Sequence, residues 1–258
     1  MPLSAVYLRD NPYVSQQQNK YQAFLRDHFH RIPVLLDRNS CIVDSSGAVL
    51  FRLLVDIVPE CLLEVLETAA QKHKQQVIKR SMVNDVRGNH ASVMFGSYVE
   101  RGGSGKIWTV KDHPYCTGFL EEIHTVGQFV SDLFRKVCIE VAFNVAKVPG
   151  DYRLWDAVTL LFWNLSNITK SHVDVRDLQW SMVLPFGDFT GGEIDLPYLN
   201  ARVKVKRKDI YLINSNKVYH TVCESSPDRQ VLVFTNHRSV VQRFCNIQIT
   251  NLFTQINI

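Results

Sequence analysis

The sequence predicts an α+β fold in which N-terminal helices support a double-stranded β-helix, the jelly-roll or cupin-like arrangement. Two observations predict this fold. Phe119 to Lys147 carries apolar residues at helical spacing along one face and is the strongest helix pattern of the chain. From about Val158 onward, short β-rich runs follow one another with turn residues between them. Many short strands at close spacing are typical of a sandwich or jelly roll.

Residues 1–150 are expected to provide mixed helical support and substrate-side elements. Helical spacing of apolar residues predicts two further helices, and Pro59 suits the first turn of the second. A polar turn at residues 45–47 splits an apolar stretch into a hairpin. The expected elements are helices at Ser15–Arg31 and Asp56–Gln76, a hairpin at Cys41–Val55, a strand at Ala91–Tyr98 and a Gly-rich loop at Arg101–Lys106.

Residues 151–258 are expected to form the β-rich catalytic half of a single domain that spans residues 1–258. A chain of this length can bury one sizeable core. The expected strands are Val158–Leu165, Gln179–Leu184, Gly192–Leu196, Ala201–Lys206, Ile210–Asn214, Val218–Cys223, Arg229–Thr235 and Asn246–Phe253. The segment Gly187–Glu193, rich in glycine, is predicted to join the second and third of these strands as a tight hairpin turn.

The composition is that of an ordinary globular protein with a formal net charge of +4. This charge permits an anionic partner without demanding one. No apolar run is long enough for a membrane span, and the N-terminus lacks the pattern of a signal peptide. The six cysteines include no C-x-x-C pair, so reduced, mostly buried thiols are expected. These features predict an intracellular protein without a membrane partner.

A His-x-Asp pair and a later histidine carry the strongest chemical signal. His172 and Asp174 lie two residues apart, so in a strand both side chains project from the same face. His220, on a later strand, completes a set of two histidines and one carboxylate. This set is the facial triad of non-haem Fe(II) oxygenases. Zinc hydrolases also use two histidines and a carboxylate, so the ligands alone leave the metal open.

Arg229 favours the oxygenase interpretation. It follows His220 by nine positions and shares a predicted strand face with Val231 and Val233. An arginine among inward apolar positions is costly unless it is paired. A dicarboxylate co-substrate would supply that partner through a bidentate contact. The alternative is that Arg229 points outward near a turn.

The stretch from Ser171 to Arg238 resembles the catalytic half of the TET and J-binding-protein family of Fe(II)/2-oxoglutarate oxygenases, especially its fungal members. The matching elements cover about a quarter of the chain. They are His172-Val173-Asp174 with Asp177, Gly187–Glu193, Leu196–Leu199, Asp209-Ile210, His220–Val222 and Arg229 through Phe234–His237. Phe95–Tyr98 resembles a substrate-side segment more weakly. Lys208 replaces the family's usual glycine before Asp209. Some members place the 2-oxoglutarate arginine farther from the histidine, which makes Arg238 the alternative to Arg229.

The resemblance implies roles for these residues. His172, Asp174 and His220 would hold Fe(II), and Arg229 would pair with the far carboxylate of 2-oxoglutarate. O₂ would be the second co-substrate, and the products would be succinate, CO₂ and an oxidised substrate. The implied substrate is a methylated nucleobase, 5-methylcytosine in DNA, and a nuclear location follows if DNA is the target. A small molecule or a protein side chain stays open as the alternative substrate, and the oligomeric state is unknown.

Binding of DNA would need cations for phosphates and polar or aromatic groups for the extruded base. The candidate cations are Lys204, Lys206, Arg207, Lys208, Arg80, Arg87, Arg101 and Lys106. The candidate base-reading residues are Asn84, Asn89, His90, Asn164 and Asn167, and Trp108, Trp163 and Trp180 are candidates for stacking. Against these roles, residues 201–206 also fit a solvated strand face, and tryptophans near a barrel are more often part of the core.

Overall fold

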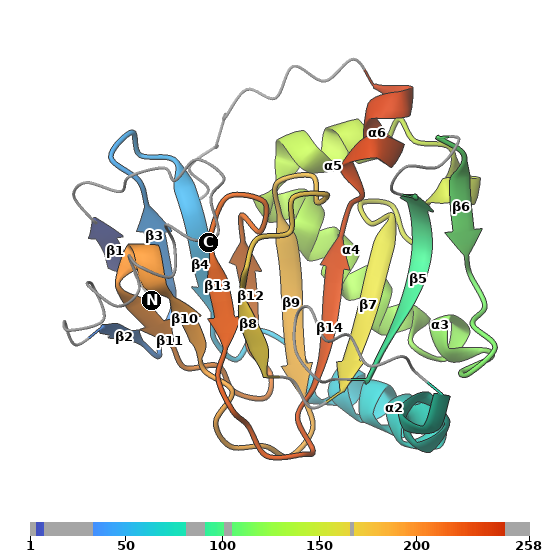
Figure 1. Ribbon diagram of the computed structural model, residues 1–258, viewed down its shortest axis with the longest axis horizontal. Helices are drawn as coiled ribbons and strands as arrows, with labels where there is room; N and C mark the ends of the chain where they lie inside the picture. Colours follow the sequence, from blue (N-terminus) through green and yellow to red (C-terminus); the bar gives the residue numbers. More distant parts are fainter. Residues whose placement is uncertain (1–3, 8–32, 81–90, 101–104, 166–167, 246–258) are drawn as a thin grey trace.

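The computed structural model describes residues 4–7, 33–80, 91–100, 105–165 and 168–245, and these residues form three layers (Figure 1). Within them, helices pack against one face of a nine-stranded sheet, and a five-stranded sheet packs against its other face. The sheet pair is the double-stranded β-helix that the sequence predicts. Strands from the first 150 residues lie in both sheets, beside strands from the second half.

The larger sheet has the strand order β1-β3-β4-β12-β9-β14-β7-β5-β6. Its strands are β1 (Ser4–Tyr7), β3 (Ser40–Val43), β4 (Val49–Leu54), β5 (Ala91–Val99), β6 (Ile107–Val110), β7 (Leu160–Leu165), β9 (Ser181–Phe186), β12 (Ile210–Ile213) and β14 (Gln230–Thr235). The smaller sheet has the order β2-β11-β10-β13-β8. Its strands are β2 (Val34–Leu36), β8 (Thr169–His172), β10 (Ile194–Leu196), β11 (Ala201–Val203) and β13 (His220–Val222).

Alternation along the central strands separates the two cores. On β14, Leu232 and Phe234 are buried against the helices, while Val231 and Val233 face the smaller sheet. The neighbouring strand β12 repeats this pattern, with Tyr211 and Ile213 on the side of the smaller sheet. Because successive side chains of a strand project to opposite faces, residues two apart reach the same space between the sheets.

Helices cover the outer face of the larger sheet (Figure 1). They are α2 (Glu60–Arg80), α3 (Phe119–Glu122), α4 (His124–Val137), α5 (Ile139–Val145) and α6 (Arg238–Phe244), with 3₁₀ turns η1 (Gly150–Tyr152) and η2 (Pro197–Leu199). In Figure 1, α2 lies at the lower end of the sheet and α6 at the upper right. The predicted hairpin at 41–55 is confirmed as β3 and β4, and the predicted helix at 56–76 as α2. No helix in the described residues is both long and apolar enough to cross a bilayer.

The single long helix expected from Phe119 to Lys147 is wrong, because the structure breaks it into α3, α4 and α5. The backbone leaves the helical region at Cys138 (φ −127°, ψ 55°), and Ile123 separates α3 from α4. A straight helix of that length would extend about 43 Å, roughly twice the length of a six-residue strand. The break lets Val141 and Val145 of α5 stay buried over the sheet.

The hairpin expected at Gly187–Glu193 is also wrong, because this loop crosses between the sheets. It leaves β9 in the larger sheet and enters β10 in the smaller one. Its glycines adopt positive φ, and a Cβ on Gly187 would lie 2.4 Å from the Asp228 carbonyl oxygen. The loop pairs with residues 224–226 through a bridge between Gly191 and Ser225. Close backbone contact, which the glycines permit, therefore replaces a hairpin.

The expected helix at 15–31 and strand at 246–253 lie outside the described residues, and so do residues 101–104 of the expected Gly-rich loop at 101–106.

Candidate active site

His172 and His220 meet across the smaller sheet. His172 ends β8, His220 begins β13, and the two residues are paired in the antiparallel register. Their ring centroids lie 4.3 Å apart. His172, Asp174 and His220 each offer one possible ligand atom, and these three atoms lie within 4.8 Å of one another. The structure thus brings the predicted triad together in space.

Main-chain carbonyls orient both imidazoles. Nδ1 of His172 lies 2.7 Å from the Lys170 oxygen, and Nδ1 of His220 lies 3.0 Å from the Val218 oxygen. An Nδ1–H that donates to a carbonyl fixes the tautomer and leaves Nε2 as the basic nitrogen. The two Nε2 atoms approach the Asp174 carboxylate at 3.9 and 3.7 Å. Two imidazole nitrogens and a carboxylate oxygen therefore converge on one point.

The expectation that one strand carries both His172 and Asp174 needs a correction. β8 ends at His172, and Asp174 lies in the following turn. The Asp174 amide donates to the Ser215 carbonyl at 2.8 Å, and the Asp174 carbonyl accepts from the Asp177 amide at 2.9 Å. The backbone leaves its pairing with β13 to make these bonds, and they direct the carboxylate toward the histidines.

The triad opens into a cavity of about 520 Å³ between the two sheets. Residues two apart line it along β12, where Tyr211 and Ile213 face it, and along β14, where Val231 and Val233 do. Arg229 extends the β14 row by one more step of two and also lines the cavity. This confirms the shared face predicted for Arg229, Val231 and Val233.

Arg229 is 1% exposed, and within the described residues none of its guanidinium nitrogens meets full hydrogen-bond geometry or forms an ion pair, with the Tyr211 hydroxyl as its nearest polar neighbour. Burial lowers the pKa of this group, which the nearby Tyr211 and Glu193 partly oppose. The Phe189 ring lies 5.6 Å from the guanidinium carbon. A Cβ on Gly192 would lie 2.5 Å from Arg229 Nε, so only glycine leaves room there. A buried cation without a partner carries a large desolvation cost, which an anionic ligand would offset.

Arg238, the alternative arginine, lies elsewhere. It begins α6, and its Nη2 donates to the Asp177 carbonyl at 3.3 Å. It is not among the residues that line the cavity. Arg238 follows the end of β14, so it does not lie on the strand face that Arg229 shares with Val231 and Val233.

The opposite end of the cavity from Arg229 contains polar groups to which the sequence analysis assigned no role. Asp177 accepts hydrogen bonds from the hydroxyls of Ser181 (2.7 Å) and Ser215 (2.9 Å). Burial, and then the charge of Asp174, raise the Asp177 pKa to about 7. His237 is 5% exposed, and both its ring nitrogens lack a partner within the described residues. Burial, and then Arg176, lower the pKa of His237 to about 4, so its ring is neutral. Asp177 and His237 both belong to segments that resemble the oxygenase family, and this resemblance was the sequence signal that could have identified them.

The remaining candidates for base and phosphate contacts differ in where they lie and in how exposed they are. Asn164 lines the cavity and accepts a hydrogen bond from Ser92 at 2.7 Å. Trp163 and Trp180 are core residues, whereas Trp108 is 43% exposed. Lys204 and Lys206 are exposed, as a solvated strand face requires, and ion pairs join Arg207 to Glu60 and Glu67, and Lys208 to Asp56. Asn84, Arg87, Asn89, His90, Arg101 and Asn167 lie outside the described residues, and so does the Arg80 side chain.

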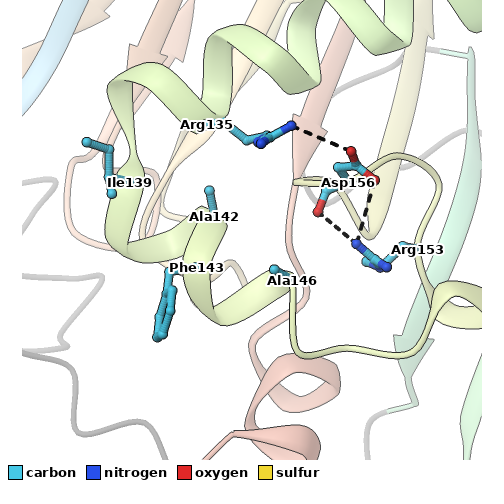
Figure 2. Close-up of a pocket in the computed structure, with 7 residues that line it drawn as sticks. All are labelled: Arg135, Ile139, Ala142, Phe143, Ala146, Arg153 and Asp156. Carbon is cyan, nitrogen blue, oxygen red and sulfur yellow. Dashed lines mark hydrogen bonds and ion pairs between the residues drawn. The ribbon is translucent and has the colours of Figure 1, made fainter.

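A second cavity of about 430 Å³ lies beside α5 (Figure 2). Its one acidic residue is already engaged, because Asp156 pairs with Arg135 at 3.6 Å and with Arg153 at 3.8 Å. The remaining lining residues are apolar and include Ile139 and Phe143. This composition offers no acid, base or ligand set, so the cavity between the sheets is the candidate site.

No protein-family model matches this chain, and a search of curated proteins also finds no match. Among solved structures, NgTET1 in complex with 5mC DNA matches with a TM-score of 0.64 and 17% sequence identity, over 87% of this chain and 92% of that one. This chain shares the NgTET1 fold. Two other structures match at a TM-score of 0.42 and 12% identity over 72% of this chain. They are the 2OG complex of the viral collagen prolyl hydroxylase vCPH from Paramecium Bursaria Chlorella virus-1, 94% of which is covered, and OsALKBH1, 96% of which is covered.

Proposed function

We propose that this chain is an Fe(II)/2-oxoglutarate-dependent dioxygenase whose residues 1–258 act as one catalytic unit. One observation carries the proposal: the convergent His172, Asp174 and His220 share a cavity with the buried guanidinium of Arg229, which has no ion-pair partner within the described residues. The triad matches the ligands of non-haem Fe(II). The guanidinium supplies the cation that a dicarboxylate needs, and zinc hydrolysis would give it no role.

Bound Fe(II) supplies the chemistry that couples reduction of O₂ and oxidative decarboxylation of 2-oxoglutarate to oxidation of a substrate C–H bond, with succinate and CO₂ as products. The chain's own residues supply position and shielding. Arg229 holds the far carboxylate of the co-substrate through its fork of N–H donors. Burial raises the Tyr211 pKa to about 12, so its phenol stays neutral beside this carboxylate. Val231 and Val233 keep the wall between the two ends of the cavity apolar.

We propose a methylated nucleobase, 5-methylcytosine in DNA, as the substrate. The polar end of the cavity supports this choice. A neutral His237 ring offers one donor and one acceptor, and Asp177, whose backbone forms a bridge with that of His237, also lines this end of the cavity. Such a pair fits the donor and acceptor edge of a base, which must leave the stack to reach a site between sheets. The NgTET1 structure, whose fold this chain shares, is a complex with 5mC DNA.

The test is a reaction of the whole chain with Fe(II), 2-oxoglutarate and O₂ on DNA that contains 5-methylcytosine. Mass spectrometry of the digested nucleosides should show an oxidised methylcytosine, with succinate formed in the same reaction. Unmethylated DNA is the control and should give no new base. Succinate without any oxidised base would support the alternative, a small-molecule or protein hydroxylase. A nuclear location stays a prediction that depends on the DNA result.

A further inference from the structure

The face of the larger sheet that lines the cavity continues beyond the cavity onto its edge strand. Thr235 of β14 pairs with Leu160 of β7, which in turn pairs with Gly96 of β5. Two residues farther along, His237 and Tyr98 therefore lie at the same level of the sheet. Tyr98 lines the cavity, and its direct cross-strand neighbour on β6 is Trp108. Directly opposite residues of an antiparallel pair project from the same face. Trp108 thus extends the wall at the substrate end.

Trp108 differs from the other tryptophans of the chain. It is 43% exposed, whereas Trp155, Trp163 and Trp180 are at most 6% exposed. The core side of β6 is occupied by Ile107, which packs against the helical core. An indole on the open face of an edge strand leaves part of its ring accessible, and Tyr98, its cross-strand neighbour, lies between it and the cavity.

Positive charge accompanies this aromatic pair. The Lys106 ammonium lies 4.3 Å from the centroid of the Trp108 ring. An Arg243 nitrogen lies 3.3 Å from the position that a Cβ on Gly105 would occupy, which brings a cation from α6 next to the start of β6. Arg176, an exposed residue, also lines the cavity. Cations around exposed rings are the combination with which proteins hold single nucleic-acid strands.

We propose that Tyr98, Trp108 and Lys106 form a stacking platform for the nucleotide next to the one in the cavity, so this surface binds a single nucleic-acid strand. The inference rests on the proposed function, because the cavity nucleotide fixes the position of its neighbour. Extrusion of a base unstacks that neighbour, which then gains by stacking on an exposed ring. Lys106 and Arg243 contact its phosphates.

The test measures binding of a fluorescein-labelled single-stranded 12-mer with one central 5-methylcytosine by fluorescence anisotropy at low salt. Trp108→Ala should weaken binding about 5- to 160-fold, the range for loss of one base–aromatic stack, and Trp108→Phe should retain most of the binding. Phe143→Ala is the matched control. Phe143 is 64% exposed and carries Lys147 at 4.3 Å from its ring, but it lies on α5 at the other cavity (Figure 2). This control should bind like the unchanged chain.

A second readout separates the platform from folding and from the proposed function. Trp108 lies outside the cavity lining, so Trp108→Ala should keep the rate at which free 5-methyldeoxycytidine is oxidised while it loses oxidation of the 12-mer. Equal 12-mer binding by Trp108→Ala and the unchanged chain overturns the platform, and oxidation of the 12-mer by the unchanged chain then leaves the proposed function standing. Absence of 12-mer binding by the unchanged chain overturns the platform too. If no methylated base is oxidised either, the proposed substrate also fails.

Discussion

Arg229→Met removes the cation at the closed end of the cavity and keeps most of the side-chain volume. Loss of one partner of a buried charged pair typically costs about 2–5 kcal/mol of binding free energy, which corresponds to roughly 30- to 5,000-fold weaker binding of 2-oxoglutarate. The same change should not destabilise the free protein. Because the guanidinium is 1% exposed and has no ion-pair partner within the described residues, its removal should raise the free energy of unfolding by about 1–4 kcal/mol.

Isothermal titration calorimetry of 2-oxoglutarate into the Mn(II)-loaded protein measures the first effect, and urea denaturation of the metal-free protein measures the second. Affinity for Mn(II) itself should stay unchanged, since Arg229 is not a ligand. Arg238→Met is the control and should bind 2-oxoglutarate within threefold of the unchanged chain. A normal affinity in Arg229→Met, or its loss in Arg238→Met alone, would refute the assignment of the buried guanidinium to the co-substrate.

Three further predictions concern the triad, the loop and pH. His172→Ala or Asp174→Ala should lose stoichiometric metal binding and keep the circular dichroism spectrum; one bound equivalent of metal in either variant would exclude the triad. Gly192→Ala should weaken 2-oxoglutarate binding at least tenfold, because the new Cβ would meet Arg229 at 2.5 Å and the φ of +74° is strained for alanine, and normal calorimetric affinity would contradict this. Since burial depresses the pKa of His237 from 6.5 to about 4, its contribution to stability is complete above pH 6.5 and is lost as the pH falls toward 4. His237→Gln should therefore lose less stability than the unchanged chain between pH 7.5 and 4.5 in urea denaturation, and equal losses would show that His237 is not buried as a neutral ring.

Strand alternation made much of the fold predictable from the sequence. The β-rich runs between residues 158 and 235 and the 41–55 hairpin follow from local apolar spacing, which the structure preserves. The same alternation placed Arg229, Val231 and Val233 on one face, and all three line the cavity. Residue spacing also predicted that His172, Asp174 and His220 share one site, although only the structure shows that Asp174 lies after the end of the strand.

Long-range contacts decided the features that the sequence did not reveal. The loop at 187–193 has the composition of a hairpin, but its contacts with residues 224–226 direct it to the other sheet. The helix pattern at 119–147 is continuous, and only the dimensions of the sheet beneath it require the break at Cys138. Burial of His237 depends on neighbours such as Thr159, whose hydroxyl accepts from its amide at 3.1 Å across 78 positions of sequence. No local pattern contains that information.

The most direct measurement is an anaerobic titration of the chain with Fe(II) and then 2-oxoglutarate, followed by visible absorption. One equivalent of each should bind, and addition of the keto acid should produce a charge-transfer band that Asp174→Ala lacks. Fe(II) that fails to bind, or a keto acid that binds without changing the iron spectrum, would contradict a shared site between the sheets.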